Sequence, residues 1–291
     1  MRSIILTLAL GALCSSVEAQ SDEARSAFLA GKKALEQNDA SKAVALFEKA
    51  IALEPRSSEY HDWLGRAYGT QAENASVLKQ PFLAKKTRSA WEKAIALDPD
   101  NITAREDIIQ YYLLAPGFLG GSKDKAKQQA VEVKRRNPYR GALVAGQVCA
   151  AVKDHGCAES ELKWVINTYP DSSLGYTSLS AYYASEKQFD RAFAVIDARL
   201  KARPTDPVAL YSLGRTVSIS AQNLERGDEA LRAYIAAPPE NGPSVANAHY
   251  RLGLIAEKRG DKDFARREYR AALQINPHYK EAKKALAALG G

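Results

Sequence analysis

The sequence predicts an all-α protein, a solenoid of repeated helix-turn-helix units. The pattern Ala-x3-aromatic-x2-Ala-x4-Pro recurs along the chain, most clearly over Ala43–Pro55 and Ala265–Pro277. A Leu-Gly-x2-Tyr-like element precedes it in one copy after another, and the copies repeat about every 34 residues. Small residues let two helices approach closely, and a proline ends the second helix because it has no N–H to donate. These three observations fix the fold class.

Seven copies follow one another, each with a first helix, a turn and a second helix. The units span residues 24–57, 58–101, 102–138, 139–172, 173–206, 207–245 and 246–277. Residues 278–291 keep an apolar face, as expected of a terminal capping helix. The second unit carries an insertion over residues 69–87. We expect the insertion to lengthen the first helix before a loop, with Phe82 and Leu83 reaching the groove or covering an exposed edge.

The period and these residue positions resemble the tetratricopeptide repeat, and the resemblance covers nearly all of residues 20–291. It implies one solenoid domain, a right-handed superhelix whose first helices line a concave groove. It also implies a non-catalytic scaffold or adaptor that binds a protein or peptide partner. The chain departs from the family at His61, which occupies the usual tryptophan site beside Trp63, and at the double proline Pro238-Pro239.

The expected groove lining mixes both charge signs with aromatic and amide side chains. That composition suits an extended peptide or a partner helix, which needs donors, acceptors and apolar pockets. The residues expected to face the groove are Phe28, Lys32, Glu59, Asp62, Arg66, Glu106, Gln110, Arg140, Gln147, Thr177, Tyr211, Arg215, Asn247 and Tyr250. Family members that bind chaperone tails use a Lys/Asn/Arg carboxylate clamp. Lys32 has no matching Asn in the second unit, so that ligand is not expected.

The segment Ala115–Lys123 interrupts the third unit and leaves two interpretations open. Gly120 and Gly121 can turn backbone N–H groups toward one point, and Ser122 can cap the helix that begins near Lys123. This gives a small anion site and, with it, an alternative function as a small-ligand or anion-binding protein. The second interpretation is an ordered turn whose apolar residues 118 and 119 tuck into the solenoid.

The first residues predict export. Met1-Arg2 gives a short positive start, residues 4–13 form an apolar run shorter than an ordinary membrane span, and Ala19 supplies a small residue for cleavage. Such a segment is typical of a secretory signal peptide, so we expect a mature periplasmic protein, beginning after Ala19, with no transmembrane segment. Leu13 stands before Cys14 where a lipoprotein peptidase expects a small residue, which argues against a lipid anchor.

Two cysteines follow the predicted signal peptide, Cys149 near the end of one helix and Cys157 in the turn before its partner. An even count in an oxidising compartment predicts a disulfide between them, with two separate thiols as the alternative.

The remaining composition argues against other classes of function. The net charge is +7, with lysines and arginines concentrated on second helices, which form the solvated outer face. An export signal argues against a nucleic-acid partner. The four histidines, His61, His155, His249 and His278, are not spaced as metal ligands, and no hydrolase motif is present. We therefore expect no catalytic residue, metal or cofactor. The repeat pattern does not specify the oligomeric state.

Overall fold

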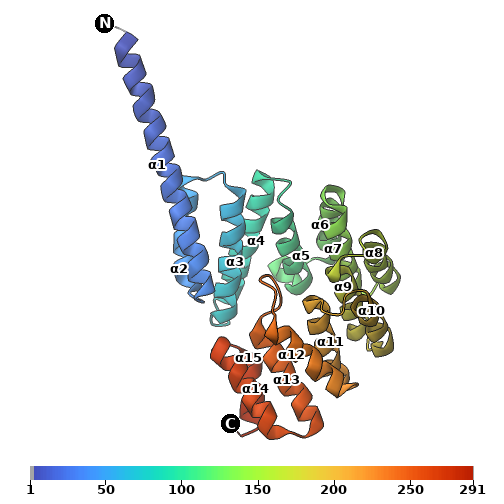
Figure 1. Ribbon diagram of the computed structural model, residues 1–291. Coiled ribbons are helices and arrows are strands. Elements are labelled where there is room, and N and C mark those ends of the chain that lie inside the picture. The colour runs from blue at the N-terminus through green and yellow to red at the C-terminus, as the bar shows by residue number, and fades with distance from the viewer. Residues whose placement is uncertain (1–2, 291) are drawn as a thin grey trace. The chain divides into compact units, whose positions relative to one another are not determined.

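The computed structural model describes the backbone of residues 3–290 and the side chains of residues 20–290. Over the described backbone it contains fifteen α-helices, one 3₁₀ helix and no β-strand. The chain divides into two compact units, Met1–Val152 and Lys153–Gly291, called here the N-terminal and C-terminal units. Figure 1 shows a succession of paired helices within each unit. The predicted all-α solenoid is confirmed.

The N-terminal unit is a run of paired helices with one 3₁₀ turn. Its elements are α1 (Ser3–Glu36), α2 (Ala40–Leu53), α3 (Ser58–Asn74), α4 (Gln80–Leu97), α5 (Ile102–Leu114), η1 (Gly117–Leu119), α6 (Lys123–Arg136) and α7 (Pro138–Ala151).

The C-terminal unit continues the same alternation and ends in a short helix. Its elements are α8 (His155–Thr168), α9 (Ser173–Ser185), α10 (Phe189–Ala202), α11 (Pro207–Ser220), α12 (Leu224–Ala236), α13 (Val245–Arg259), α14 (Lys262–Ile275) and α15 (Lys280–Ala288). The last of these, α15, packs on α14 at the predicted capping position.

The helix boundaries follow the predicted repeat units closely, with two exceptions of note. The insertion at 69–87 lengthens both helices of its pair, because α3 continues to Asn74 and α4 already begins at Gln80. The division between the compact units falls between α7 and α8, inside the fourth predicted repeat. A single domain over residues 20–291 stays a prediction. The predicted signal peptide, its cleavage site and Cys14 lie outside the residues whose side chains are described.

Side-chain caps set many of the helix starts. Asp39, Ser57 and Asn101 each precede a helix and accept a hydrogen bond from a backbone N–H in its first turn. Those N–H groups have no partner within the helix, so a capping side chain stabilises the start by about 1 kcal/mol. Pro207, at the first position of α11, has no N–H that needs a partner there.

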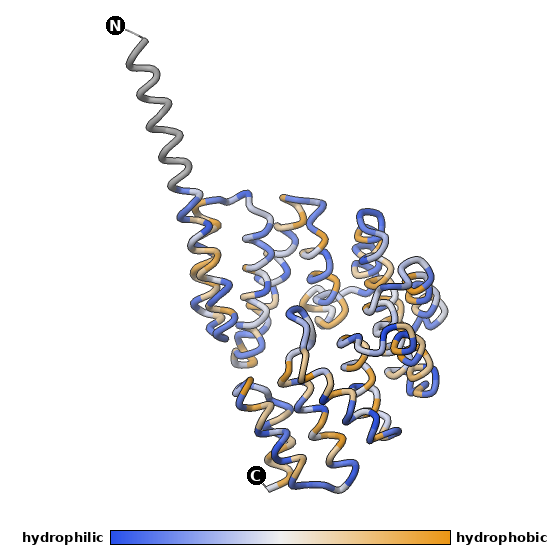
Figure 2. Tube along the Cα trace, viewed as in Figure 1, coloured by the Kyte–Doolittle hydropathy of each residue, from blue (hydrophilic) through white to orange (hydrophobic). Residues whose placement is uncertain are grey.

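The two helices of a pair meet where a glycine of the first faces a large side chain of the second. A Cβ added to Gly31 would lie 2.6 Å from the Phe47 ring, and one added to Gly65 would lie 2.6 Å from the Trp91 ring. Gly253 stands in the same relation to Tyr269, which is fully buried. Apolar and hydrophilic residues alternate along these helices in Figure 2. The glycine therefore sets the distance at which the apolar faces pack.

We expect Gly253→Ala to lower the free energy of unfolding by about 1–2 kcal/mol, because overpacking at the Tyr269 ring outweighs the gain in helix propensity. Urea unfolding of the full chain measures the change. Gly156→Ala on α8 is the matched control, since nothing lies nearer to its added Cβ than Asp154 Oδ1 at 3.9 Å. A loss of stability in the control as large as that at Gly253 would contradict the packing argument.

Candidate functional site

Cation–ring contacts and an ion pair link successive first helices of the N-terminal unit. The Nζ atom of Lys32, on α1, lies 4.6 Å from the centre of the Trp63 ring on α3. The Arg66 guanidinium lies 4.8 Å from the same ring, and its Nε donates to Asp107 on α5 at 2.7 Å. A cation–ring contact at an exposed site contributes about 0.5–1 kcal/mol. These contacts of Lys32, Trp63, Arg66 and Asp107 form a row that joins α1 to α3 and α3 to α5.

The same face joins α5 to α7. Arg140 Nε donates to the Glu106 carboxylate at 2.8 Å, and the Gln110 amide donates to Gln147 at 3.3 Å. The sequence predicted all four residues as groove lining, and the structure brings them together in pairs. Partly exposed ion pairs contribute about 0–1 kcal/mol. Their larger consequence is that Arg66, Glu106 and Arg140 already have partners of opposite charge.

Asp62 is the most perturbed titratable group on this face. Its side chain is buried, with 3% of the residue exposed, and its Oδ1 atom has no hydrogen-bond partner among the described residues. Burial raises the pKa of Asp62 to about 7; Arg66, 3.4 Å away, opposes the rise and Asp107 adds to it. A buried carboxylate without full pairing is costly, which explains the direction of the shift.

Burial corrects the predicted lining at three positions. Phe28 stacks on Tyr60 with ring centres 4.7 Å apart, Asp62 is covered, and Tyr211 packs against Tyr234 at 5.2 Å. All three are buried rather than exposed. Rings of neighbouring helices pack on Phe28 and Tyr211.

An apolar pocket of about 450 Å³ opens beside this row in the N-terminal unit. Trp91 and Thr87 of α4 are its buried residues, while Tyr111 and Leu114 of α5 form one wall. Asp107 also lines it and connects it to Arg66. Its further lining residues are Gly69, Ala72, Glu73, Gln80, Ala84, Gln110, Ala115, Pro116 and Leu119. Of this set, only Gln110 had been assigned to the groove from the sequence.

The Gly120–Ser122 segment is an ordered turn that follows the pocket-lining residues Ala115, Pro116 and Leu119. The N–H groups of Gly120, Gly121 and Ser122 are all hydrogen-bonded, to the carbonyl oxygens of Gly117, Pro116 and Tyr112. The backbone N–H groups of Gly120, Gly121 and Ser122 are therefore not available to the predicted anion site at Gly120, Gly121, Ser122 and Lys123. The expectation for the apolar pair is half met: Leu119 lines the pocket, but Phe118 is 84% exposed.

The turn depends on its glycines. Gly120 has φ +95°, and a Cβ there would collide with the Arg88 guanidinium, which donates to the Leu119 carbonyl at 3.2 Å. Tyr111 Oη donates to the same carbonyl at 2.7 Å. At Gly121 an added Cβ would collide with the Ala115 carbonyl oxygen. The glycines thus permit a compact wall held by two side chains that flank the pocket.

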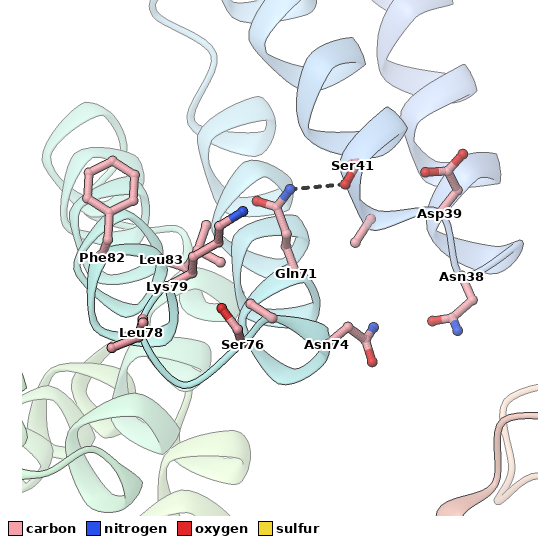
Figure 3. Close-up of a pocket in the computed structure, with 12 residues that line it drawn as sticks. Asn38, Asp39, Ser41, Gln71, Asn74, Ser76, Leu78, Lys79, Phe82 and Leu83 are labelled. Atoms are coloured by element: carbon pink, nitrogen blue, oxygen red, sulfur yellow. Dashed lines mark hydrogen bonds between the residues drawn. The ribbon is translucent and has the colours of Figure 1, made fainter.

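A second, more polar pocket lies at the α1–α2 turn and the α3–α4 loop of the same unit (Figure 3). Its volume is about 780 Å³. Gln71 donates to Ser41 at 3.1 Å within it. Phe82 is exposed at its edge, whereas Leu83 is buried, so the two apolar residues of the insertion divide between surface and core. Its remaining lining residues are Asn38, Asp39, Ala40, Asn74, Ala75, Ser76, Leu78 and Lys79.

The C-terminal unit brings four predicted lining residues onto two adjacent first helices. Tyr211 and Arg215 lie one turn apart on α11, and Asn247 and Tyr250 lie on α13, which packs against it. Arg251, which the sequence analysis missed, reaches from α13 to the Ser218 hydroxyl of α11 at 3.4 Å. Its position beside Tyr250, one turn after Asn247, was the signal that could have identified it. Thr177 lies half-buried on α9.

The remaining candidate residues belong to the fold. Cys149 and Cys157, which the sequence predicts to be bridged, are both disulfide-bonded in the structure. His61 bonds the Pro55 carbonyl and His249 bonds Glu268, so both are used within their helix pairs. Among the described side chains no three His, Cys, Asp or Glu residues form a group suited to a metal ion. No helix in that part of the chain has the length and apolarity required to cross a bilayer.

We expect the raised pKa of Asp62 to make the stability of the protein depend on pH. In the folded state Asp62 keeps its proton up to about pH 7, whereas in the unfolded state it loses the proton near pH 4. The free energy of unfolding therefore falls as the pH rises between those two values. Relative to wild type, Asp62→Asn should gain about 2–3 kcal/mol in free energy of unfolding between pH 5 and pH 8.

Urea unfolding of both proteins at the two pH values measures this difference. Asp171→Asn is the control, because the hydrogen bond from Arg203 holds the pKa of Asp171 below its ordinary value and outside this window. A difference between Asp62→Asn and wild type that is the same at pH 5 and pH 8 would show that Asp62 titrates normally.

Comparison with known proteins identifies tetratricopeptide repeats in the chain. Two models described as tetratricopeptide repeat match it, over residues 21–76 and 246–279. A human relative, Protein O-mannosyl-transferase TMTC1, is 28% identical over 228 residues, 78% of this chain. The chain spans only 24% of that relative's length.

Two solved structures share the fold. A tetratricopeptide repeat protein from Parabacteroides merdae superposes with a TM-score of 0.58 at 13% identity, covering 93% of this chain and 100% of that one. Yeast Tom70 superposes with a TM-score of 0.66 at 12% identity, covering 92% of this chain and 56% of that one. These likenesses show that the chain has the fold of tetratricopeptide repeat proteins, and the two repeat models identify residues 21–76 and 246–279 as tetratricopeptide repeats.

Proposed function

We propose that the protein is an exported, non-catalytic scaffold that binds an extended segment of a partner protein on the first-helix face of its N-terminal unit. The matches to tetratricopeptide repeats support a role as a scaffold, since such repeats commonly form protein-interaction surfaces. The apolar pocket beside the first-helix face supports binding of an extended segment there.

The pocket provides a source of binding energy for a ligand that the paired charges of the face do not provide. Arg66, Glu106 and Arg140 are bound to partners on neighbouring helices, so they add little net attraction for a ligand. The pocket, in contrast, leaves Leu114 81% exposed above a buried Trp91. An apolar cavity of this size accepts one large side chain and excludes water from it, which is how binding hot spots obtain most of their energy.

The rim of the pocket fits the main chain that would carry such a side chain. Asp107, Gln110 and Glu73 line the pocket and present carboxylate and amide groups beside its apolar walls. An extended segment needs hydrogen-bond partners for its amides, and the Glu73 carboxylate favours a cationic neighbour of the apolar anchor, since Asp107 is already paired with Arg66. The expected ligand is therefore an apolar residue flanked by Lys or Arg.

Selection of short peptides on the full chain, followed by fluorescence anisotropy, tests the pocket. We expect Leu114→Glu to weaken the selected peptides at least tenfold, since it puts a charge at the mouth of an apolar cavity. Val131→Glu on α6 is the matched control, because Val131 is also exposed in the same unit but does not line the pocket. Equal affinity of wild type, Leu114→Glu and the control would place the binding surface elsewhere.

The export part of the proposal rests on the sequence of residues 1–19. A small residue at position 19 after an apolar run favours cleavage there, which would begin the mature chain at Gln20. Mass spectrometry of the protein recovered from the periplasm should give that N-terminus. A protein that retains residues 1–19, or that begins at a lipid-modified Cys14, would contradict the export route.

A further inference from the structure

Two arginines on the first-helix face of the C-terminal unit lack a partner of opposite charge. Arg215 on α11 and Arg251 on α13 are both only partly exposed. In the described part of the chain neither forms an ion pair with a carboxylate, whereas the buried Arg199 of the same unit bonds Asp206 at 2.6 Å. Their positive charges are therefore left uncompensated by the protein itself.

Among the described residues the two guanidinium groups together form a single side-chain hydrogen bond. The Nε atom of Arg251 is fully buried without a partner among the described residues, and its Nη1 reaches only the Ser218 hydroxyl, at 3.4 Å. Burial, followed by the positive charge of Arg251, lowers the pKa of Arg215. Holding two like charges together in a half-buried place costs free energy, and an unpaired buried N–H adds to that cost.

Two tyrosine rings lie beside Arg251. Tyr250 and Tyr279 lie with ring centres 5.1 Å apart, and Arg251 lies 5.8 Å from the Tyr250 ring. Burial raises the pKa of Tyr279 to about 12, with Arg251 opposing the rise and Tyr211 and Tyr250 adding to it. Arg215 and Arg251 lie on helices that pack together, and both are only partly exposed. A charge interaction made in such a place is stronger than one in open water.

We propose that Arg215 and Arg251 bind a doubly charged oxyanion, namely a phosphate group that is either free or carried on a larger ligand. A guanidinium group presents its N–H donors as a planar fork that matches the oxygens of phosphate. Two such forks balance a dianion, whereas a single carboxylate would leave one positive charge unpaired. Asn247, one turn before Arg251, offers an amide for a further hydrogen bond.

This site is independent of the proposed peptide pocket. The arginine pair belongs to the C-terminal unit and the pocket to the N-terminal unit, so either can fail without the other. It also differs from the loop at Gly120–Ser122, whose N–H groups are occupied.

Isothermal titration calorimetry and thermal unfolding of the full chain test the site, with inorganic phosphate as the probe at constant ionic strength. Phosphate should release heat and raise Tm, and acetate at the same ionic strength should do neither. Arg215→Gln and Arg251→Gln should each weaken phosphate binding at least tenfold. Arg270→Gln, which removes an exposed arginine of α14, is the charge-matched control and should bind like wild type.

A second readout separates loss of the site from loss of the fold. Without phosphate, Arg215→Gln should unfold at a higher temperature than wild type because the repulsion from Arg251 is removed. If a variant does not fold, the comparison of phosphate with acetate on the wild type still decides. Equal effects of phosphate and acetate on the wild type, or undiminished binding by the folded double variant, would overturn the proposal.

A short peptide with and without phosphoserine identifies the source of the phosphate. Binding of the phosphopeptide at least tenfold tighter than inorganic phosphate would assign the group to a larger ligand. Equal affinity for the two would assign it to free phosphate, and both results support the site.

Discussion

Close approach of paired helices at a glycine is the constraint on which the rest of the structure depends. Gly31, Gly65 and Gly253 each occupy the same repeat position, opposite a ring of the second helix. Because the glycine carries no side chain, the ring fills the space between the helices and the apolar faces meet across it. That spacing decides which residues of the first helix remain on the outer edge of the pair, and therefore where the rows of contacts in both units can form.

The same regularity explains how much the sequence alone could predict. A repeat places small residues, rings and caps at fixed intervals, so the helix pairs and the capping helix α15 follow from local patterns. Exposure does not follow from them. Phe28 and Tyr211 point toward the predicted face, yet Tyr60 and Tyr234 cover them. Whether a residue is covered depends on the size of a side chain in another helix. The residue's own position in its helix gives no information about that side chain.

The first-helix arginines of the two units differ in whether they are paired with acids. In the N-terminal unit Arg66 and Arg140 are neutralised by Asp107 and Glu106 across neighbouring helices, and the cost of burial falls on Asp62. In the C-terminal unit Arg215 and Arg251 form no ion pair with any acid among the described residues. The sequence pattern predicts only that arginines occupy lining positions in both units. The difference arises from which residue the adjacent helix presents, so the pairing state required the folded arrangement.

The loop at 115–123 shows why a glycine-rich string is weak evidence for an anion site. Gly120 and Gly121 do adopt the compact backbone that such a site needs. A phosphate loop must also leave its N–H groups without internal partners, and here each is bonded to a carbonyl of the preceding residues. The glycines instead bring the Leu119 carbonyl to Arg88 and Tyr111, which fixes one wall of the apolar pocket. Backbone freedom thus serves pocket shape in this unit, and unpaired positive charge is found on the rigid helices α11 and α13, where side chains rather than N–H groups would hold an anion.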